Sequence, residues 1–136
     1  MQYFSFLCSC CREKAPSRKE KRKNLWERIK SFLMEHIDAD PDFYDKLSYV
    51  AKWYLEYDDE CDCSWREIGL DCHNNIIIEM PDEHNYGFWL DTNCTIDDFR
   101  KMSGFKMITE QEFNDLWNSV KYDRKAGVFI PNCNAR

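Results

Sequence analysis

The sequence predicts an α+β fold in which an antiparallel sheet of about four to five strands has helices packed on one face. Three observations lead to this class. Apolar residues recur at helical spacing over 25–37, strand-like alternation and a hairpin turn occupy the middle of the chain, and two helix-capping patterns follow. With 136 residues, 43% of them hydrophobic, the chain suits one folded domain.

That domain is expected to span residues 24–136 and to begin with two helices. The first is predicted over 24–38, where Asn24 can cap it. The second is predicted over 40–48, because it opens with an Asp-Pro pair that suits a cap and a first helical position. Alternating apolar and polar residues then favour a strand over 49–58, although the apolar spacing also fits a longer helix.

The middle of the chain predicts a β-hairpin. Apolar and polar residues alternate over 68–72, and the β-branched run 76–78 supplies the return strand. Residues 73–75 read His-Asn-Asn, which favours a turn because asparagine tolerates the left-handed backbone region. A further strand is expected over 86–90.

Two helices are predicted near the end of the chain. Thr95 with Asp98 starts a short one, and Thr109 with Glu112 forms a capping box that opens another. The second helix has an apolar stripe made of Phe113, Leu116, Trp117 and Val120. Residues 127–130 suit a last edge strand, which the following proline would end.

Residues 1–23 are predicted to be a flexible basic tail outside the fold. They contain seven basic and two acidic residues, a net charge of +5, and three of the eight cysteines: Cys8, Cys10 and Cys11. These three are candidates for lipid attachment, since an acyl chain next to a basic run gives stable membrane anchoring. The alternative is a disordered tail of reduced thiols. Without a convincing signal peptide, the sequence favours a cytoplasmic protein with reduced cysteines, and membrane association through this tail is the alternative localisation.

The other 113 residues carry a net charge of −11, which the +5 of the tail reduces to −6 for the whole chain. This acidity argues against a nucleic-acid ligand. It favours a basic protein partner. Two acidic loops with nearby aromatics are the candidate partner-binding residues: Asp58, Asp59, Glu60, Asp62, Trp65, Asp82, Glu83, Tyr86 and Trp89. The alternatives are a solvated loop for the charges and core positions for the aromatics.

No pattern predicts catalysis, a metal or another cofactor. Cys61 and Cys63 are separated by one residue, whereas paired zinc ligands are usually two to four apart, and Cys72 and His73 are adjacent. A Cys94–His84 dyad has no supporting motif, and phosphate-binding, nucleophile-elbow and metalloprotease signatures are absent from the sequence. The protein is therefore expected not to be an enzyme.

Four segments in order carry a resemblance to a known family. They read AKWYLEYDDE, WREIGLDCHNNIIIEM, TIDDFRKM and ITEQEFNDLWNSV, within residues 49–120. Together they resemble a family of small bacterial domains of unassigned function that occur among immunity-type proteins near polymorphic toxins. Cys61, Cys63 and Cys72 depart from the family pattern.

The resemblance implies a small cytosolic antidote that blocks a toxin by binding it. We therefore expect an immunity protein that occludes the active site of a cognate toxin domain with a basic surface. A membrane-tethered adaptor anchored through the N-terminal tail is the second hypothesis, and a small uncharacterised enzyme is the third. The sequence leaves the oligomeric state open.

Overall fold

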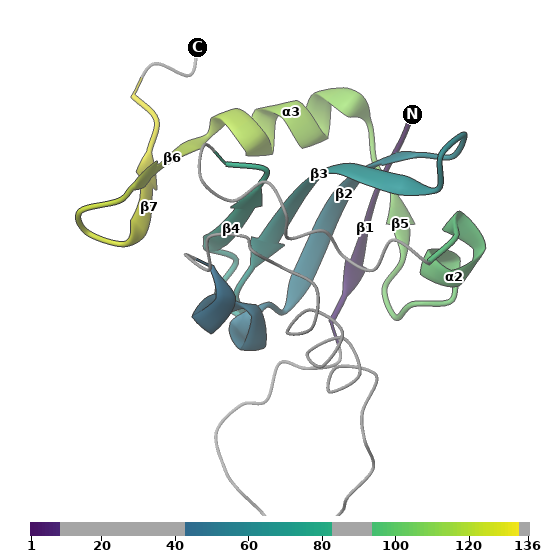
Figure 1. Cartoon of the computed structure of the whole chain (residues 1–136), viewed down its shortest axis with the longest axis horizontal. Helices are drawn as coiled ribbons and strands as arrows, with labels where there is room; N and C mark the ends of the chain where they lie inside the picture. The colour runs from purple at the N-terminus through teal and green to yellow at the C-terminus, as the bar shows by residue number, and fades with distance from the viewer. Residues whose placement is uncertain (9–42, 83–93, 134–136) are drawn as a thin grey trace, which may run out of the picture.

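The computed structural model describes residues 1–8, 43–82 and 94–133, which form mostly antiparallel sheet with few helices (Figure 1). The strands are β1 (Gln2–Leu7), β2 (Lys52–Asp58), β3 (Cys63–Leu70), β4 (Ile76–Met80), β5 (Lys106–Met107), β6 (Val120–Asp123) and β7 (Val128–Pro131). The helical segments are the 3₁₀ helix η1 (Tyr44–Tyr49) and the α-helices α2 (Ile96–Arg100) and α3 (Glu110–Asn118). The predicted antiparallel sheet of a mixed α and β protein is thus present. None of the helices in these ranges is long and apolar enough to cross a membrane.

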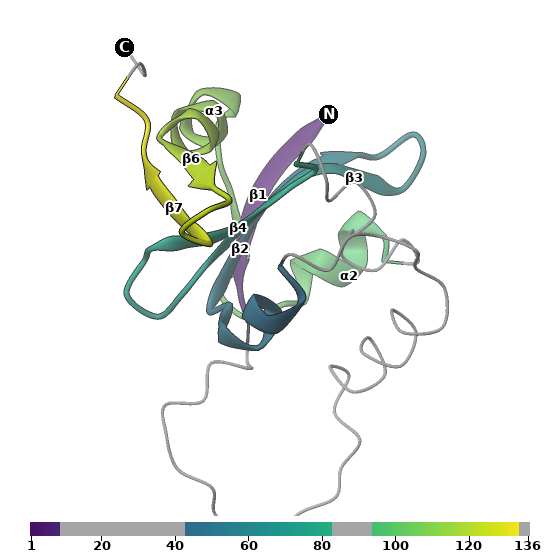
Figure 2. The same ribbon diagram turned by 60° about the vertical axis from the view of Figure 1, so that its left-hand side comes forward.

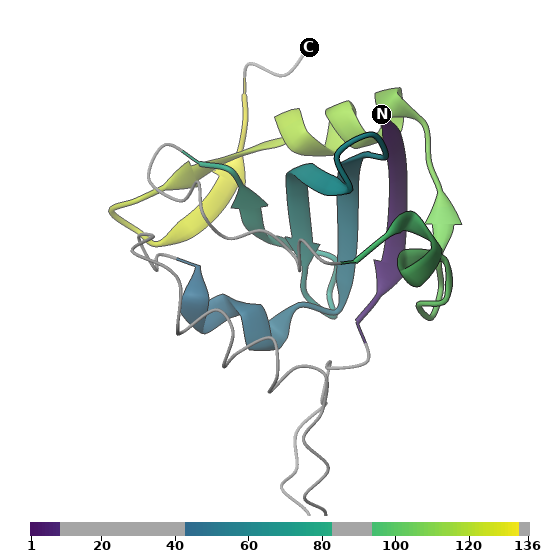
Figure 3. The same cartoon turned by 45° about the vertical axis from the view of Figure 1, so that its right-hand side comes forward.

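The main sheet has the order β4-β3-β2-β1-β5, and every neighbouring pair of strands is antiparallel. β1 is an interior strand, paired along its whole length with β2 and through Phe4 and Ser5 with β5. Figure 3 shows β1 beside β2, with β5 and α2 near its other edge. The prediction that residues 1–23 lie outside the fold is therefore wrong for residues 2–7. The rest of that segment, the predicted helix over 24–38 and the predicted strand over 86–90 lie outside the described residues.

Two apolar clusters form because side chains alternate between the faces of the sheet. One face contains Phe4 and Trp53 and packs against Phe99 of α2 and residues of η1. The other contains Ile68 and packs against Phe113 of α3. Figure 2 shows α3 on one side of the sheet and α2 on the other. The prediction that helices pack on one face is therefore not confirmed.

Most locally encoded elements begin where the sequence indicates. The capping boxes of Thr95 with Asp98 and of Thr109 with Glu112 are both formed. The turn between β3 and β4 has Asn74 at a φ of 62°, the left-handed geometry that asparagine tolerates. The end of the α3 stripe was predicted wrongly, since Val120 already belongs to β6.

The β6–β7 hairpin is a separate two-stranded sheet, and Lys46 of η1 is among the residues that contact it. The Nζ atom of Lys46 donates a 2.7 Å hydrogen bond to the carbonyl oxygen of Gly127. It also lies 5.5 Å, 4.8 Å and 5.8 Å from the ring centroids of Phe43, Tyr122 and Phe129. A cation among aromatic faces is stabilising, so this contact helps to hold the hairpin against the rest of the fold.

Gly69 in β3 is expected to tolerate no side chain. A Cβ added there would lie 3.0 Å from Val50 Cγ2 and 3.2 Å from both Ile78 Cβ and Trp53 Cζ3. Because these atoms belong to the packed core, Gly69→Ala should lower the free energy of unfolding by about 1–3 kcal/mol. Urea denaturation of the wild type and the variant measures this difference, and equal midpoints would contradict the packing described.

Candidate partner-binding site

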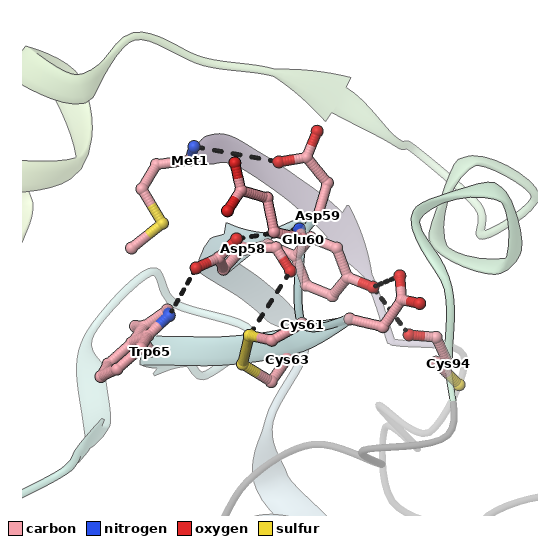
Figure 4. The surroundings of a disulfide bond; sticks show 10 residues. Met1, Asp58, Asp59, Glu60, Cys61, Cys63, Trp65 and Cys94 are labelled. Carbon is pink, nitrogen blue, oxygen red and sulfur yellow. Dashed lines mark hydrogen bonds and ion pairs between the residues drawn. A yellow bond between two sulfur atoms is a disulfide. The ribbon is translucent and has the colours of Figure 1, made fainter.

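The tip of the β2–β3 hairpin brings together five of the predicted binding residues (Figure 4). We call this group the acidic tip; it consists of Asp58, Asp59, Glu60, Asp62 and Trp65. The turn is closed by an oxygen of Asp58, which accepts a 2.9 Å hydrogen bond from the backbone N–H of Glu60. Asp62 takes a φ of 50°, a left-handed conformation that aspartate adopts more readily than most residues.

Trp65 lies at an irregularity in the strand pairing. Glu56 is opposite Arg66 and Tyr57 is opposite Ser64, so the ladder skips Trp65. Such bulges often re-aim a side chain near a functional site. Trp65 is 51% exposed, and its indole N–H donates a 3.3 Å hydrogen bond to Asp58. An exposed aromatic surface is therefore held beside the carboxylates.

The carboxylates of the acidic tip differ in their hydrogen bonds and in their exposure to solvent. Asp59 accepts a 2.8 Å hydrogen bond from the side-chain amide of Gln2. That bond and one from its own backbone N–H hold the pKa of Asp59 below its ordinary value. Glu60 is exposed and projects from the turn. The tip thus presents negative charge to solvent at neutral pH.

Tyr57 connects the acidic tip to the segment that precedes α2. Its hydroxyl lies 3.0 Å from Asp62 Oδ1 and 3.1 Å from the carbonyl oxygen of Cys94. Burial first, and then the hydrogen bond to Asp62, raise the pKa of Tyr57 to about 12. The hydroxyl therefore remains a proton donor that fixes the turn.

The cysteines of the tip are joined, which corrects the expectation that all thiols are reduced. Cys61 and Cys63 form a disulfide across the single residue Asp62. Cys72 and Cys133 are exposed free thiols. Among the described residues, no cluster of three or more His, Cys, Asp and Glu side chains is placed to hold a metal ion.

The other predicted site residues do not join this group. Asp82 follows β4, and its carboxylate forms a 2.6 Å ion pair with Arg124, so its charge is compensated. Cys8 follows β1; its N–H donates to the carbonyl oxygen of Ala51, and its side chain packs against the core. The remaining candidates, Glu83, Tyr86, Trp89, Cys10 and Cys11, lie outside the described residues.

A polar network on the α3 face was not predicted from the sequence. Glu56 accepts hydrogen bonds from the hydroxyl of Tyr3 and from the guanidinium of Arg66, which also donates to Asn114 of α3 at 2.9 Å. The guanidinium carbon lies 4.9 Å from the ring centroid of Phe113. The network links three strands to α3, and a structural role accounts for it.

The charges of Glu56 and Arg66 in this polar network stabilise one another. Burial raises the pKa of Glu56, but the hydrogen bonds from Arg66 and Tyr3 and the charge of Arg66 outweigh it, so the net shift is downward. The bond to Glu56 in turn raises the pKa of Arg66. Burial, followed by the contact with Glu56, raises the pKa of Tyr3 to about 12.

A shallow groove of about 470 Å³ lies between the sheet and α3. It is lined by two lysines, Lys52 and Lys106, and by two carboxylates, Glu112 and Asp115. Glu112 is engaged in the capping box and Asp115 accepts from Gln111. The balanced charges of the groove favour no single class of ligand.

The stability of the protein should depend on the protonation of Glu79 in β4. Burial, and then the charge of Asp82, raise the pKa of this carboxyl to about 8, and its Oε1 has no hydrogen-bond partner among the described residues. The folded state therefore binds a proton that the unfolded state releases above about pH 4.5. Stability is full below that pH and falls as the pH rises towards about 8.

We expect the free energy of unfolding of the wild type to fall by about 2 kcal/mol more than that of Glu79→Gln between about pH 5.5 and 7.5. Urea denaturation at several pH values measures the difference. Parallel pH profiles for the two proteins would contradict the assignment.

The fold and tip define a small mixed α and β protein with an acidic, tryptophan-bearing hairpin. Comparisons of the chain with protein-family models, with curated proteins and with solved structures found no match.

Proposed function

We propose that the protein is a binding module whose acidic tip docks on a basic surface of another protein. The observation that supports this most is the irregular pairing that leaves Trp65 51% exposed beside the carboxylates. A large aromatic in water is unfavourable unless a partner covers it, and tryptophan is among the commonest anchors of protein interfaces. The proposal assigns Trp65 the role of anchor.

The carboxylates have a different role in this proposal. Four acidic residues within 58–62 create a negative potential that steers a basic partner towards the tip. Since Asp59 is held by Gln2 of β1 and Asp58 caps the turn, their side chains lose little freedom on binding. The tip is thus preorganised for electrostatic recognition.

We further propose that the partner is a bacterial toxin domain and that the protein is its immunity protein. Toxins that act on nucleic acid need a basic groove to bind phosphate, and an acidic hairpin that projects from a sheet has a shape and charge that can fill such a groove. The resemblance over residues 49–120 supports this identity. Inhibition then needs only occlusion and no chemistry by the immunity protein.

Co-expression with a toxin encoded by a neighbouring gene tests the proposal. The wild type should restore growth, and the tip variant Asp59→Asn/Glu60→Gln/Trp65→Ala should not. The control variant Asp97→Asn/Glu110→Gln/Tyr49→Ala, which removes two exposed carboxylates and an exposed aromatic elsewhere, should protect like the wild type. Equal protection by both variants would refute the assignment of the tip, and no protection by the wild type would refute the immunity function.

A further inference from the structure

We propose that the Cys61–Cys63 disulfide is a thiol–disulfide exchange site that reacts preferentially with cationic thiols. It differs from the proposed docking role, because it assigns a covalent reaction to the hairpin and requires no toxin. Three features of the tip support the exchange role: the disulfide contributes little to the stability of the hairpin, one of its sulfurs is accessible, and its surroundings are negatively charged.

The hairpin is held without the bridge. Pairing of Asp58 with Cys63 and of Tyr57 with Ser64 continues the β2–β3 ladder up to the turn, and Asp58 closes the turn itself. The stabilisation by a disulfide grows with the length of chain it closes, and this one spans a single residue. The fold should therefore survive reduction of the bridge.

The bridge is also accessible to a reactant. Cys61 is exposed at the turn while Cys63 is half-buried at the start of β3, so an incoming thiolate meets Cys61 first. Exposed disulfides are the labile members of their class. The turn can also accommodate the reduced thiol of Cys61. Its sulfur lies 4.0 Å from the carbonyl oxygen of Asp58, within reach of a weak S–H hydrogen bond.

The exchange proceeds in two balanced steps. A substrate thiolate attacks the sulfur of Cys61; the Cys61–Cys63 bond breaks, a mixed disulfide forms, and Cys63 leaves as a thiolate that takes up a proton. A second substrate thiolate then attacks the substrate sulfur of the mixed disulfide and releases Cys61, which is protonated in turn. Two substrate thiols are oxidised to one disulfide, and the protein disulfide is reduced by the same two electrons.

The acidic tip sets the preference among thiols. Asp58, Asp59, Glu60 and Asp62 belong to the same turn as the bridge, and Figure 4 shows the labelled ones, Asp58, Asp59 and Glu60, on one side of it. They repel an anionic thiol and attract a cationic one. For a few charges at close range in dilute salt, the normalised rates should differ by about tenfold, and screening should remove most of that difference near ~1 M salt.

The test compares reduction by cysteamine, 2-mercaptoethanol and 2-mercaptoethanesulfonate, which are cationic, neutral and anionic. Acid quenching, alkylation and peptide mass analysis measure the thiols of Cys61 and Cys63 over time. Each rate is divided by the rate of the same reagent with a neutral small disulfide, which removes differences in thiol reactivity. We expect cysteamine to be fastest and the sulfonate slowest, with the order lost in high salt and circular dichroism unchanged on reduction.

Variants locate the reaction. Cys63→Ser should trap a stable mixed disulfide at Cys61 when treated with cystamine, because no resolving thiol remains. Cys72→Ser removes an exposed thiol of another turn and should leave the exchange rates at the tip unchanged. The proposal is overturned by normalised rates that do not depend on reagent charge, by loss of the fold on reduction, or by Cys61 and Cys63 staying thiols in the presence of cystamine.

Discussion

Replacing Phe4 by alanine is expected to lower the free energy of unfolding by about 3–5 kcal/mol. Phe4 is fully buried in β1, and its ring lies 5.2 Å from that of Phe99 and 5.3 Å from that of Phe105, measured between centroids. Truncation would remove the ring contacts between the sheet and the segments around α2, and the surrounding core cannot fill the space. Chemical denaturation monitored by circular dichroism measures the loss.

Leu7→Ala is the matched control for Phe4→Ala. Leu7 ends the same strand but is 47% exposed, so its truncation should cost less than about 1 kcal/mol. A tail outside the fold would make both substitutions neutral. Equal small effects at the two positions would therefore contradict the place of β1 inside the sheet.

Arg66→Met is expected to cost about 2–3 kcal/mol, the second largest effect. The methionine keeps much of the apolar contact with Phe113 and Trp117 but leaves the carboxylate of Glu56 largely buried, with the hydroxyl of Tyr3 still donating to it. The side chain of Glu56 is only 11% exposed, so water replaces the lost hydrogen bond poorly. Equilibrium denaturation at neutral pH measures this cost.

A double-mutant cycle separates the pair from its surroundings. Glu56→Leu combined with Arg66→Met should be more stable than the sum of the two single effects predicts, by about 1–2 kcal/mol. The pKa of Glu56 is lowered in the folded state, so the pair stabilises the protein above the ordinary carboxyl pKa and loses this effect as the pH falls through the folded pKa. Additive effects, or a wild type and Arg66→Met with the same acid profile, would show that the pair is not coupled.

Structure that adjacent residues encode is predictable from this sequence. The turn at 73–75 was predicted because asparagine accepts a left-handed backbone, and Asn74 adopts it. The two capping boxes were predicted from residues three apart, and both helices start there. The acidic residues at 58–62 were recognised as a loop for the same reason.

Contacts between distant segments were not predictable in this way. β1 pairs with strands that begin about 50 and 100 residues later, and its six residues do not alternate between apolar and polar along their whole length. The alternation of Phe4, Ser5 and Phe6 is the available signal for a strand there. The Glu56–Arg66 pair also depends on strand register, which a single sequence leaves open.

For the candidate site too, the sequence predicts the residue types but not the contacts between segments. The sequence identified the charges of the acidic tip and Trp65 as a candidate anchor. It did not show that the β2–β3 ladder skips Trp65, that Cys61 bonds to Cys63, or that Arg124 neutralises Asp82. The first and the third depend on how two strands or two hairpins meet, whereas the disulfide depends on the conformation of a single turn.

The affinity of the purified neighbouring toxin domain for three forms of the protein tests the docking role of the acidic tip most directly. Isothermal titration at several salt concentrations should give a tight, salt-sensitive complex for the wild type and for Asp97→Asn/Glu110→Gln/Tyr49→Ala. The variant Asp59→Asn/Glu60→Gln/Trp65→Ala should bind at least about 100-fold more weakly, because it loses the aromatic anchor and two steering charges, and its affinity should depend less on salt. Equal affinity and equal salt dependence for all three forms would contradict the proposal.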